Sequence, residues 1–321
     1  MEFLLSDVHD DLASTVDALL TKADVPSRTR AWIDGDRGPI TEVFGALADT
    51  GINGLLIDES AGGASAGAVE MVVAMEQIGR HALPGPVVES IAVLPVLFHT
   101  ADVTGEQVSA LAEGRFATVA IPPTAPLAPT AEVAYLVRDG VLSTATAGET
   151  RATVDPTRTL AELVPGDVLA DGVDVEDAVD IGTLATAAEL LGMAKAMLAL
   201  ASDYAQARKQ FGRPIGSFQA VKHHLADVAI AVEMARPLVH AAALGVDGLM
   251  PEGTDVGRDV AAAKVAAGDA AHLASRRALQ VLGAIGYTSE HDLSLYLTKT
   301  RALLTAWGTP AALRRRVLES L

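Results

Sequence analysis

The residues with the clearest chemical potential lie between positions 204 and 222, where a long apolar helical pattern breaks near Pro214 and then resumes. Around the break the chain presents Arg208, Phe211 and Gln219. An arginine can make two parallel hydrogen bonds to a phosphate, and a phenylalanine packs against planar rings. The grouping therefore indicates a site for a planar, phosphorylated ligand. The alternative is an ordinary turn between two helices, with a solvated arginine.

The same segment resembles the flavin-binding signature of the acyl-CoA dehydrogenase family, which reads Y-A-x-x-R-x-Q-F-G-x-P-I-x-x-F-Q-A-V-x-x-x-L-A-D. The match starts at Tyr204 and runs without a gap to Asp227. A second stretch, from Gln280 to Tyr287 with Glu290 beyond it, is similar to the family's Q-x-x-G-G-x-G-Y-x-x-E. The N-terminal hundred residues match more weakly, and the middle of the chain matches poorly.

The resemblance implies FAD as the cofactor and a flavin that lies at a subunit interface, with its ADP portion held by the neighbouring chain. The residues that would hold this portion are Arg208, Phe211, Gln219, Gln280 and Gly283. A glycine at position 283 lets the backbone approach a cofactor closely. Inherited interface packing without a bound flavin is the alternative interpretation.

The resemblance also implies a reaction, in which a carboxylate removes the α-proton of an acyl-CoA thioester and the β-hydride passes to the flavin. In most of the family the base is a glutamate seventeen residues after the second motif, and this chain has Trp307 there. An indole N–H donates and cannot act as a base. A minority of the family places the base on the helix before the flavin signature, and the matching position here lies near Gly182, with Thr183 next, neither of which is a base. Glu189 lies on the same helix face, about 10 Å further along, and is an alternative candidate for the base. A polar position at a helix surface or subunit contact explains Glu189 more simply.

A second omission lies in the middle of the chain. Family members have a T-E-P-x-A-G-S-D loop and a W-I-T-N-like strand that line the flavin ring, and residues 106–178 contain neither. The pattern is therefore asymmetric, because the residues that hold a neighbour's cofactor are present while the base and the ring-binding loop are absent. In this respect the chain resembles the short, degenerate subunit of actinobacterial heteromeric acyl-CoA dehydrogenases, several of which act on steroid side chains.

Three regions differ in sequence pattern. Residues 1–105 and 179–321 have apolar side chains at helical spacing, while residues 106–178 are rich in β-branched residues and prolines. We predict helices over about 219–248, 254–282 and 292–306, strands over 115–121, 131–138 and 151–155, and a hairpin at Asp139-Gly140. The predicted fold is mostly α with a small β domain. It comprises an N-terminal helical domain, a truncated middle β domain and a C-terminal four-helix bundle.

Composition narrows the function classes further. The 321 residues carry a formal net charge of −17, which disfavours binding to nucleic acid or to an anionic membrane surface. There is no cysteine, so disulfides and thiolate metal sites are excluded, and no metal site is predicted. No signal-peptide pattern or long uninterrupted apolar stretch is evident, so we expect a cytoplasmic protein outside the membrane.

These observations predict an oxidoreductase subunit of an FAD-dependent acyl-CoA dehydrogenase that acts in fatty acid or steroid catabolism. The expected partner is a full-length catalytic subunit in a heterotetramer, which would bind most of the acyl-CoA substrate, with an electron-transfer flavoprotein as electron acceptor. Two alternatives stay open. One is a self-sufficient homomeric enzyme that uses Glu189 or another carboxylate, and the other is a flavin-free scaffold of the same fold.

Overall fold

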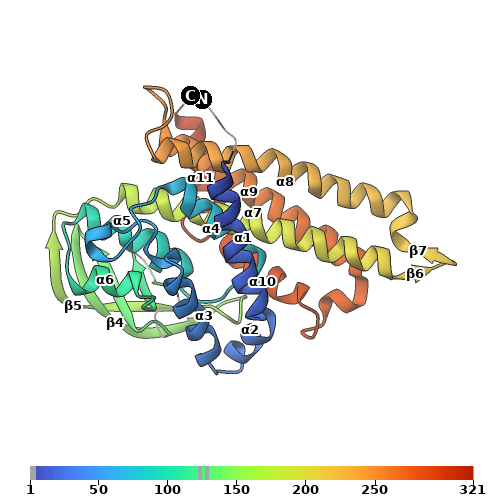
Figure 1. Cartoon of the computed structure of the whole chain (residues 1–321), viewed down its shortest axis with the longest axis horizontal. Coiled ribbons are helices and arrows are strands. Elements are labelled where there is room, and N and C mark those ends of the chain that lie inside the picture. The colour runs from blue at the N-terminus through green and yellow to red at the C-terminus, as the bar shows by residue number, and fades with distance from the viewer. Residues whose placement is uncertain (1–4, 122–124, 127–129, 321) are drawn as a thin grey trace.

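In the computed structural model, which describes residues 5–121, 125–126 and 130–320, the first third of the chain is helical (Figure 1). The helices are α1 (Asp7–Lys22), α2 (Val25–Ile33), α3 (Gly38–Asp49), α4 (Ala68–Arg80), α5 (Leu94–Thr100) and α6 (Glu106–Ala112). A π-helical segment, η3 (Glu89–Val93), leads directly into α5. Helix α4 is the buried member of the group, because ten of its residues are shielded from solvent.

A five-stranded sheet follows, with strand order β1-β3-β4-β5-β2. Its strands are β1 (Ala117–Ala120), β2 (Ala125–Pro126), β3 (Val133–Arg138), β4 (Val141–Ala152) and β5 (Thr159–Asp171). Strands β1 and β3 are parallel and the remaining pairs are antiparallel. The predicted hairpin at Asp139-Gly140 is confirmed, because both residues have positive φ (54° and 77°), as a two-residue turn between twisted strands requires.

The predicted third strand is wrong in extent. It was placed at residues 151–155, whereas β4 covers Val141–Ala152 and Asp155 lies in the turn before β5. The outer half of β4 is exposed and consists of small and polar residues, so it carries no apolar alternation by which a strand is recognised.

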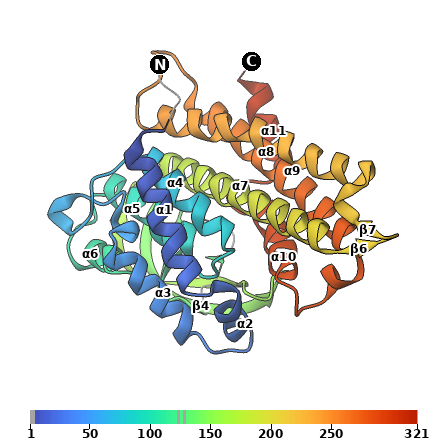
Figure 2. The same cartoon turned by 45° about the vertical axis from the view of Figure 1, so that its right-hand side comes forward.

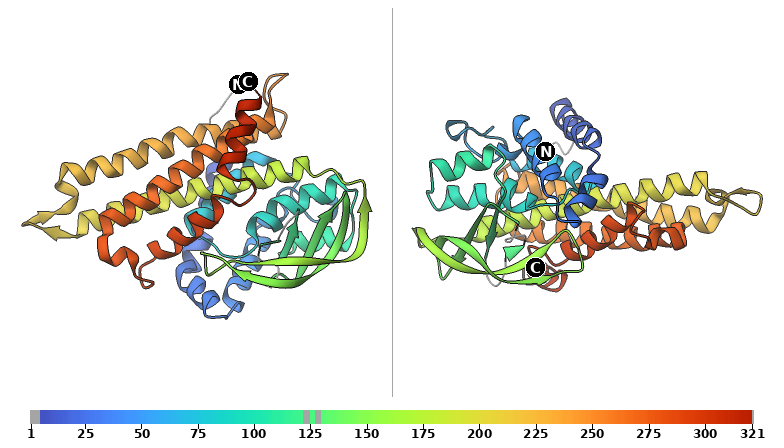
Figure 3. Two further views of the ribbon diagram at one scale, coloured as in Figure 1. Left: turned by 180° about the vertical axis from the view of Figure 1, so that it is seen from behind. Right: turned by 90° about the horizontal axis from the view of Figure 1, so that it is seen from below.

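The C-terminal region is a bundle of long antiparallel helices (Figure 2). It comprises α7 (Glu176–Ala207), α8 (Gln219–Val246) and α9 (Val256–Leu282), with the shorter α10 (Leu293–Leu303) and α11 (Pro310–Glu319) packed against α9. The helices predicted from spacing are therefore confirmed to within a few residues. The sheet lies near the N-terminal end of α7, and a small hairpin lies at the opposite end (Figure 3).

Helices α7 and α8 are both long and apolar enough to cross a membrane by length and composition alone. In α7, 78% of the apolar window is buried inside the protein, so its composition is that of a core helix. In α8 only 39% of the window is buried, which leaves one apolar face of that helix uncovered by this chain.

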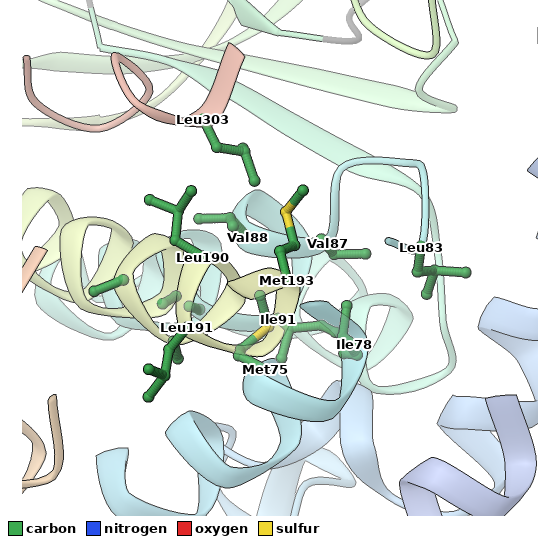
Figure 4. Close-up of a cluster of buried hydrophobic side chains, with 14 of the residues drawn as sticks. Met75, Ile78, Leu83, Val87, Val88, Ile91, Leu190, Leu191, Met193 and Leu303 are labelled. Carbon is green, nitrogen blue, oxygen red and sulfur yellow. The ribbon is translucent and has the colours of Figure 1, made fainter. Parts of the chain in front are cut away.

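The centre of the core is the crossing of α4 and α7 (Figure 4), where Met75 and Ile78 of α4 lie near Leu190 and Met193 of α7. Glycines allow the two backbones to touch. A Cβ atom at Gly79 would lie 2.1 Å from the Glu189 carbonyl oxygen, and one at Gly192 would lie 1.9 Å from the Glu76 carbonyl oxygen. No side chain can occupy either position without separating the helices.

One continuous cluster of buried side chains joins the N-terminal helices, the inner face of the sheet and the bundle. The domain boundaries expected at residues 105 and 178 coincide with the start of α6 and with the first turn of α7. Because the core is continuous across both places, the three domains stay a prediction from sequence pattern.

Replacing Gly192 by alanine tests the α4–α7 contact. We expect Gly192→Ala to lower the free energy of unfolding by about 1–3 kcal/mol or more, because the added methyl group overlaps a backbone carbonyl. Gly45→Ala is the matched control, since Gly45 lies inside α3 with no atom within 4 Å of an added Cβ. That change should stabilise the chain by about 0.5–1 kcal/mol through helix propensity. Equal thermal midpoints for the two variants would contradict the proposed contact.

Candidate functional site

A short hairpin at the far end of the bundle carries one of the predicted ligand-binding residues, Phe211, and two others, Arg208 and Gln219, lie on either side of it. Strands β6 (Lys209–Gln210) and β7 (Arg213–Pro214) pair there, and Phe211 and Gly212 form the turn with φ values of 53° and 79°. The Phe211 ring is 91% exposed. The ring meets that of Phe218 edge to face, with centroids 6.1 Å apart, and the rest of its surface is open to another molecule.

The backbone around Arg208 is fixed, while its guanidinium is exposed. The Arg208 N–H donates to the Tyr204 carbonyl, and the Arg208 carbonyl accepts from Ile215 N–H at 2.8 Å. Among the described residues the Arg208 side chain has no recorded hydrogen-bond partner, and Gln219, the first residue of α8, is exposed as well. The hairpin therefore has an exposed ring in its turn, an exposed cation just before it and an exposed amide shortly after it.

Gln280 and Gly283 lie at the end of α9, on the same end of the bundle as the hairpin (Figure 1). Both line a cavity of about 360 Å³. Gly283 ends the helix with φ 63°, a backbone conformation that favours glycine. The cavity also receives Arg276 and Arg301, and the buried hydroxyl of Thr300, which has no hydrogen-bond partner among the described atoms. An unpartnered buried donor beside two arginines is suited to a phosphate or ribose oxygen.

The uncovered face of α8 lies along the middle of that helix, away from its hairpin end. Ile230, Met234 and Leu238 are 63%, 68% and 43% exposed, and their four-residue spacing places them on one stripe of the helix. A shallow apolar depression between α7 and α8, lined by Leu198 and Leu225, lies alongside. Together with the hairpin, this stripe is the surface of the described chain best suited to packing against another subunit.

A separate cleft lies between the sheet and the segment that joins α10 to α11. Its volume is about 720 Å³, and its walls are mainly apolar, with Val119 and Leu160 from the sheet and Ala306 and Trp307 from the joining segment. Arg158 and Arg301 supply charge. In the described residues no group of three or more potential metal ligands is found, here or elsewhere.

Trp307 is held at this cleft by buried polar contacts. The indole Nε1–H donates to Glu89 Oε1 at 3.0 Å, and the Trp307 carbonyl accepts from Thr183 Oγ1 at 2.7 Å. The next carbonyl, that of Gly308, accepts from Lys264 Nζ at 3.0 Å. Trp307 has φ 50°, a conformation that is unfavourable for a bulky residue, so these contacts hold the segment in place against local strain.

The two positions that the sequence resemblance assigns to a base meet in space. A Cβ atom added at Gly182 would lie 2.8 Å from the Trp307 ring. The indole therefore fills the volume that a carboxylate from either position would need. The position predicted for the base therefore holds an N–H donor whose hydrogen bond is already made.

Sequence reasoning missed Glu89, which lies behind Trp307 and is 1% exposed. Burial raises the pKa of the Glu89 carboxyl, and the positive charge of Arg158 and the hydrogen bond from Trp307 oppose this effect. The signal in the sequence was a single glutamate inside the apolar run from Pro86 to Phe98. The carboxyl does not line the cleft, because the indole separates it from the open volume.

Lys264 and Arg158 were also missed. Lys264 is 2% exposed, and burial, together with the nearby charge of Arg158, lowers the pKa of its ammonium group to about 7. Lys264 lies on α9 and Arg158 in the turn before β5. Because neither position belongs to a recognisable motif, only the fold brings them together.

The interpretation of Glu189 needs a correction. The sequence indicated a helix surface or subunit contact, whereas Glu189 is fully buried and its Oε1 lies 2.9 Å from Lys299 Nζ. Lys299 also donates to the Leu83 carbonyl. The carboxylate therefore balances a buried cation between α7 and α10 and does not line the cleft, so nothing favours it as a base.

Comparison with known proteins adds two family-model matches. Residues 6–107 match the acyl-CoA dehydrogenase N-terminal domain, and residues 173–321 match the acyl-CoA dehydrogenase C-terminal domain. Among curated proteins, acyl-CoA dehydrogenase IpdE2 of Mycolicibacterium smegmatis is 30% identical over 318 residues, covering 98% of both chains.

Two solved structures share the fold. A chain of the ChsE4-ChsE5 complex from Mycobacterium tuberculosis superposes with a TM-score of 0.83 at 24% identity, covering 100% of this chain and 98% of that one. A chain of the Tcur3481-Tcur3483 steroid ACAD superposes with a TM-score of 0.85 at 23% identity, covering 98% and 97%. At these identities the likeness establishes the fold.

Replacing Glu89 by glutamine tests the buried carboxyl. A carboxyl with a raised folded pKa contributes stability that is complete below its usual pKa of 4.5 and is lost as pH rises through the folded pKa. Glu89→Gln keeps an acceptor for the Trp307 N–H but does not titrate. We therefore expect the thermal midpoint of the variant to rise relative to that of the parent chain as pH increases from acidic to neutral. Glu149→Gln changes an exposed residue of β4, and its thermal midpoint should differ from that of the parent chain by the same amount at every pH. If the thermal midpoints of Glu89→Gln and the parent chain differed by the same amount at every pH, the raised pKa of Glu89 would be contradicted.

Proposed function

Because the chain belongs to the acyl-CoA dehydrogenase family, whose cofactor is FAD, we propose that it is the subunit that completes the FAD site of a catalytic partner. The activity of the complex would be α,β-dehydrogenation of an acyl-CoA thioester. The observation that carries this proposal is the contrast between the two ends of α7. The hairpin end offers unpaired ligand-binding groups to a neighbour, whereas the cleft end has an indole where a base is needed.

The groups at the hairpin end suit the ADP portion of FAD. Arg208 would pair with the pyrophosphate, and Phe211 would pack against a ring. Gln280 and Gly283 line the adjoining polar cavity and would meet the remaining oxygens. Arg208, Phe211 and Gln219 are exposed, which suits a cofactor whose ring is seated in another subunit. When bound, FAD accepts the hydride from the β-carbon of the substrate.

The cleft end of this chain is unsuited to removing an α-proton. A general base must reach the proton directly or through one water molecule. Trp307 has no free lone pair for this role, Glu89 is shielded by the indole, and Glu189 is paired with Lys299. The catalytic carboxylate would therefore come from the partner, which would also bind most of the acyl-CoA.

The uncovered apolar stripe of α8 supports an assembly with another family member. The ChsE4-ChsE5 complex and the Tcur3481-Tcur3483 steroid ACAD share this fold, so a heterotetramer acting on the CoA thioester of a steroid-derived acid is the form we propose. Electrons would leave for an electron-transfer flavoprotein. The setting we propose is the cytoplasm.

The visible absorption spectrum and the native mass test this function. The chain purified alone should be colourless, and co-production with a full-length family member should give a yellow mixed tetramer with one flavin for each pair of unlike chains. Stoichiometric flavin and turnover in the lone chain would instead indicate a self-sufficient homomeric enzyme. A mixed complex without flavin would indicate a scaffold of the same fold.

The exposed arginine of the hairpin gives a sharper test. We expect Arg208→Ala to weaken FAD binding in the complex by about 1–3 kcal/mol, because a charge-assisted phosphate contact is lost. Lys209→Ala is the matched control, since it removes a neighbouring exposed cation without touching the motif arginine. FAD retention is measured by fluorescence of the released flavin during dialysis. Equal retention in the two variants would rule out the assignment of Arg208.

A further inference from the structure

A further cavity lies within the N-terminal helices, away from both sites described above. It has a volume of about 650 Å³ and is enclosed by the 3-10 segment η2 (Glu59–Ala61), by α5 and by α6. Its inner wall is apolar, because Phe98 is fully buried there and Val103 and Val108 are half-buried. The described residues that line it include none of the predicted FAD-binding residues and none of the Trp307–Gly308 segment.

The outer part of this cavity is acidic. Asp58 and Asp102 line it with exposed carboxylates, for which the structure records no hydrogen bond or ion pair among the described residues. Neither of the segments that line it, residues 56–62 and 95–109, contains a lysine or an arginine. Residues 1–178 as a whole contain 28 acidic and 9 basic residues, whereas residues 179–321 contain 13 and 15. The occupant that suits this cavity is therefore an apolar group flanked by positive charge.

The β6–β7 hairpin of a second copy of this chain offers that combination. Phe211 at its turn is 91% exposed, and Arg208 and Lys209 precede the turn with exposed side chains that have no recorded partner among the described residues. Residues 204–226 include four basic residues and no acidic one. The hairpin projects beyond the adjoining ends of α7 and α8 (Figure 1), so its turn can enter a cavity.

We propose that Phe211 of one copy inserts into this cavity of a second copy, where Asp58 and Asp102 pair with Arg208 and Lys209. The cavity elements α5 and α6 lie at the opposite end of the molecule from the hairpin (Figure 1), so a chain cannot fill its own cavity. The contact is head to tail, and such contacts build open chains or rings. A docked hairpin is not free to hold FAD, so this self-assembly and the FAD-completing role proposed above exclude each other.

The association of the lone chain, without FAD or partner, tests this proposal. Met234→Glu is the common background, because a charge at that position opposes association through the apolar stripe of α8. Sedimentation velocity at sub-millimolar concentration should show that this chain forms dimers and larger species.

Two charge-reversed variants are then compared in that background. The first reverses the cavity charges, with Asp58→Lys and Asp102→Lys. The second reverses the hairpin charges, with Arg208→Glu and Lys209→Glu. Each variant alone should associate at least about tenfold more weakly than the background chain, because like charges meet at the contact. An equimolar mixture of the two should associate again, since each variant supplies the surface that the other lacks.

The position of the contact is checked with p-benzoylphenylalanine at position 211, which cross-links to a neighbouring chain on illumination. The cross-linked peptide should map to residues 56–62 or 95–109. A background chain that stays monomeric, reversed variants that associate as strongly as that chain, a mixture that stays monomeric, or a cross-link elsewhere would each overturn the proposal. If a reversed variant fails to fold, the cross-link still decides the matter. Because no step contains FAD, failure here leaves the proposed function standing, and failure of that function would not change these results.

Discussion

The contact between the backbones of α4 and α7 is the constraint on which the rest of the structure depends. Gly79 and Gly192 let the helices meet without intervening side chains, and this fixes the path of α7 through the core. Thr183, near one end of α7, helps to hold Trp307, and Arg208 follows the other end. At 1.5 Å per residue these two positions lie roughly 38 Å apart. A single rigid element therefore sets the distance between the cleft and the hairpin.

The polar groups near the two ends of α7 differ in burial and in hydrogen bonding. At the cleft, Glu89, Thr183 and Lys264 are buried and each has a partner in the Trp307–Gly308 segment. At the hairpin, the backbone is fixed by hydrogen bonds, Phe211 meets Phe218 edge to face, and the Arg208 side chain has no recorded hydrogen bond to another described residue. Satisfied buried groups hold one conformation, whereas unsatisfied exposed groups remain available to a ligand. The chain thus has one end whose buried polar groups are paired within the chain and one end whose polar groups are exposed.

The sequence predicted the features that depend on local spacing. The helices of the bundle, the Asp139-Gly140 turn and the position of Arg208 on a helix–helix corner all follow from neighbours in the chain. The roles of Glu189 and Glu89 depend on residues more than a hundred positions away, Lys299 in one case and Trp307 in the other. Helical periodicity states which face a residue occupies, but it does not identify the element that covers that face. For this reason a buried ion pair was mistaken for a surface glutamate, and Glu89, Arg158 and Lys264 went unnoticed.

The uncovered apolar stripe of α8 would affect the stability of copies of the chain that have no partner. Ile230, Met234 and Leu238 form an exposed hydrophobic surface whenever no other subunit covers them, and such a surface favours association. Newly made copies in excess of their partner would associate with one another or be recognised by chaperones and proteases. The supply of the partner would then set the amount of this chain that persists. The ratio of this chain to its partner in the cell would then depend on the exposed surface of α8, even if the two chains were made at different rates.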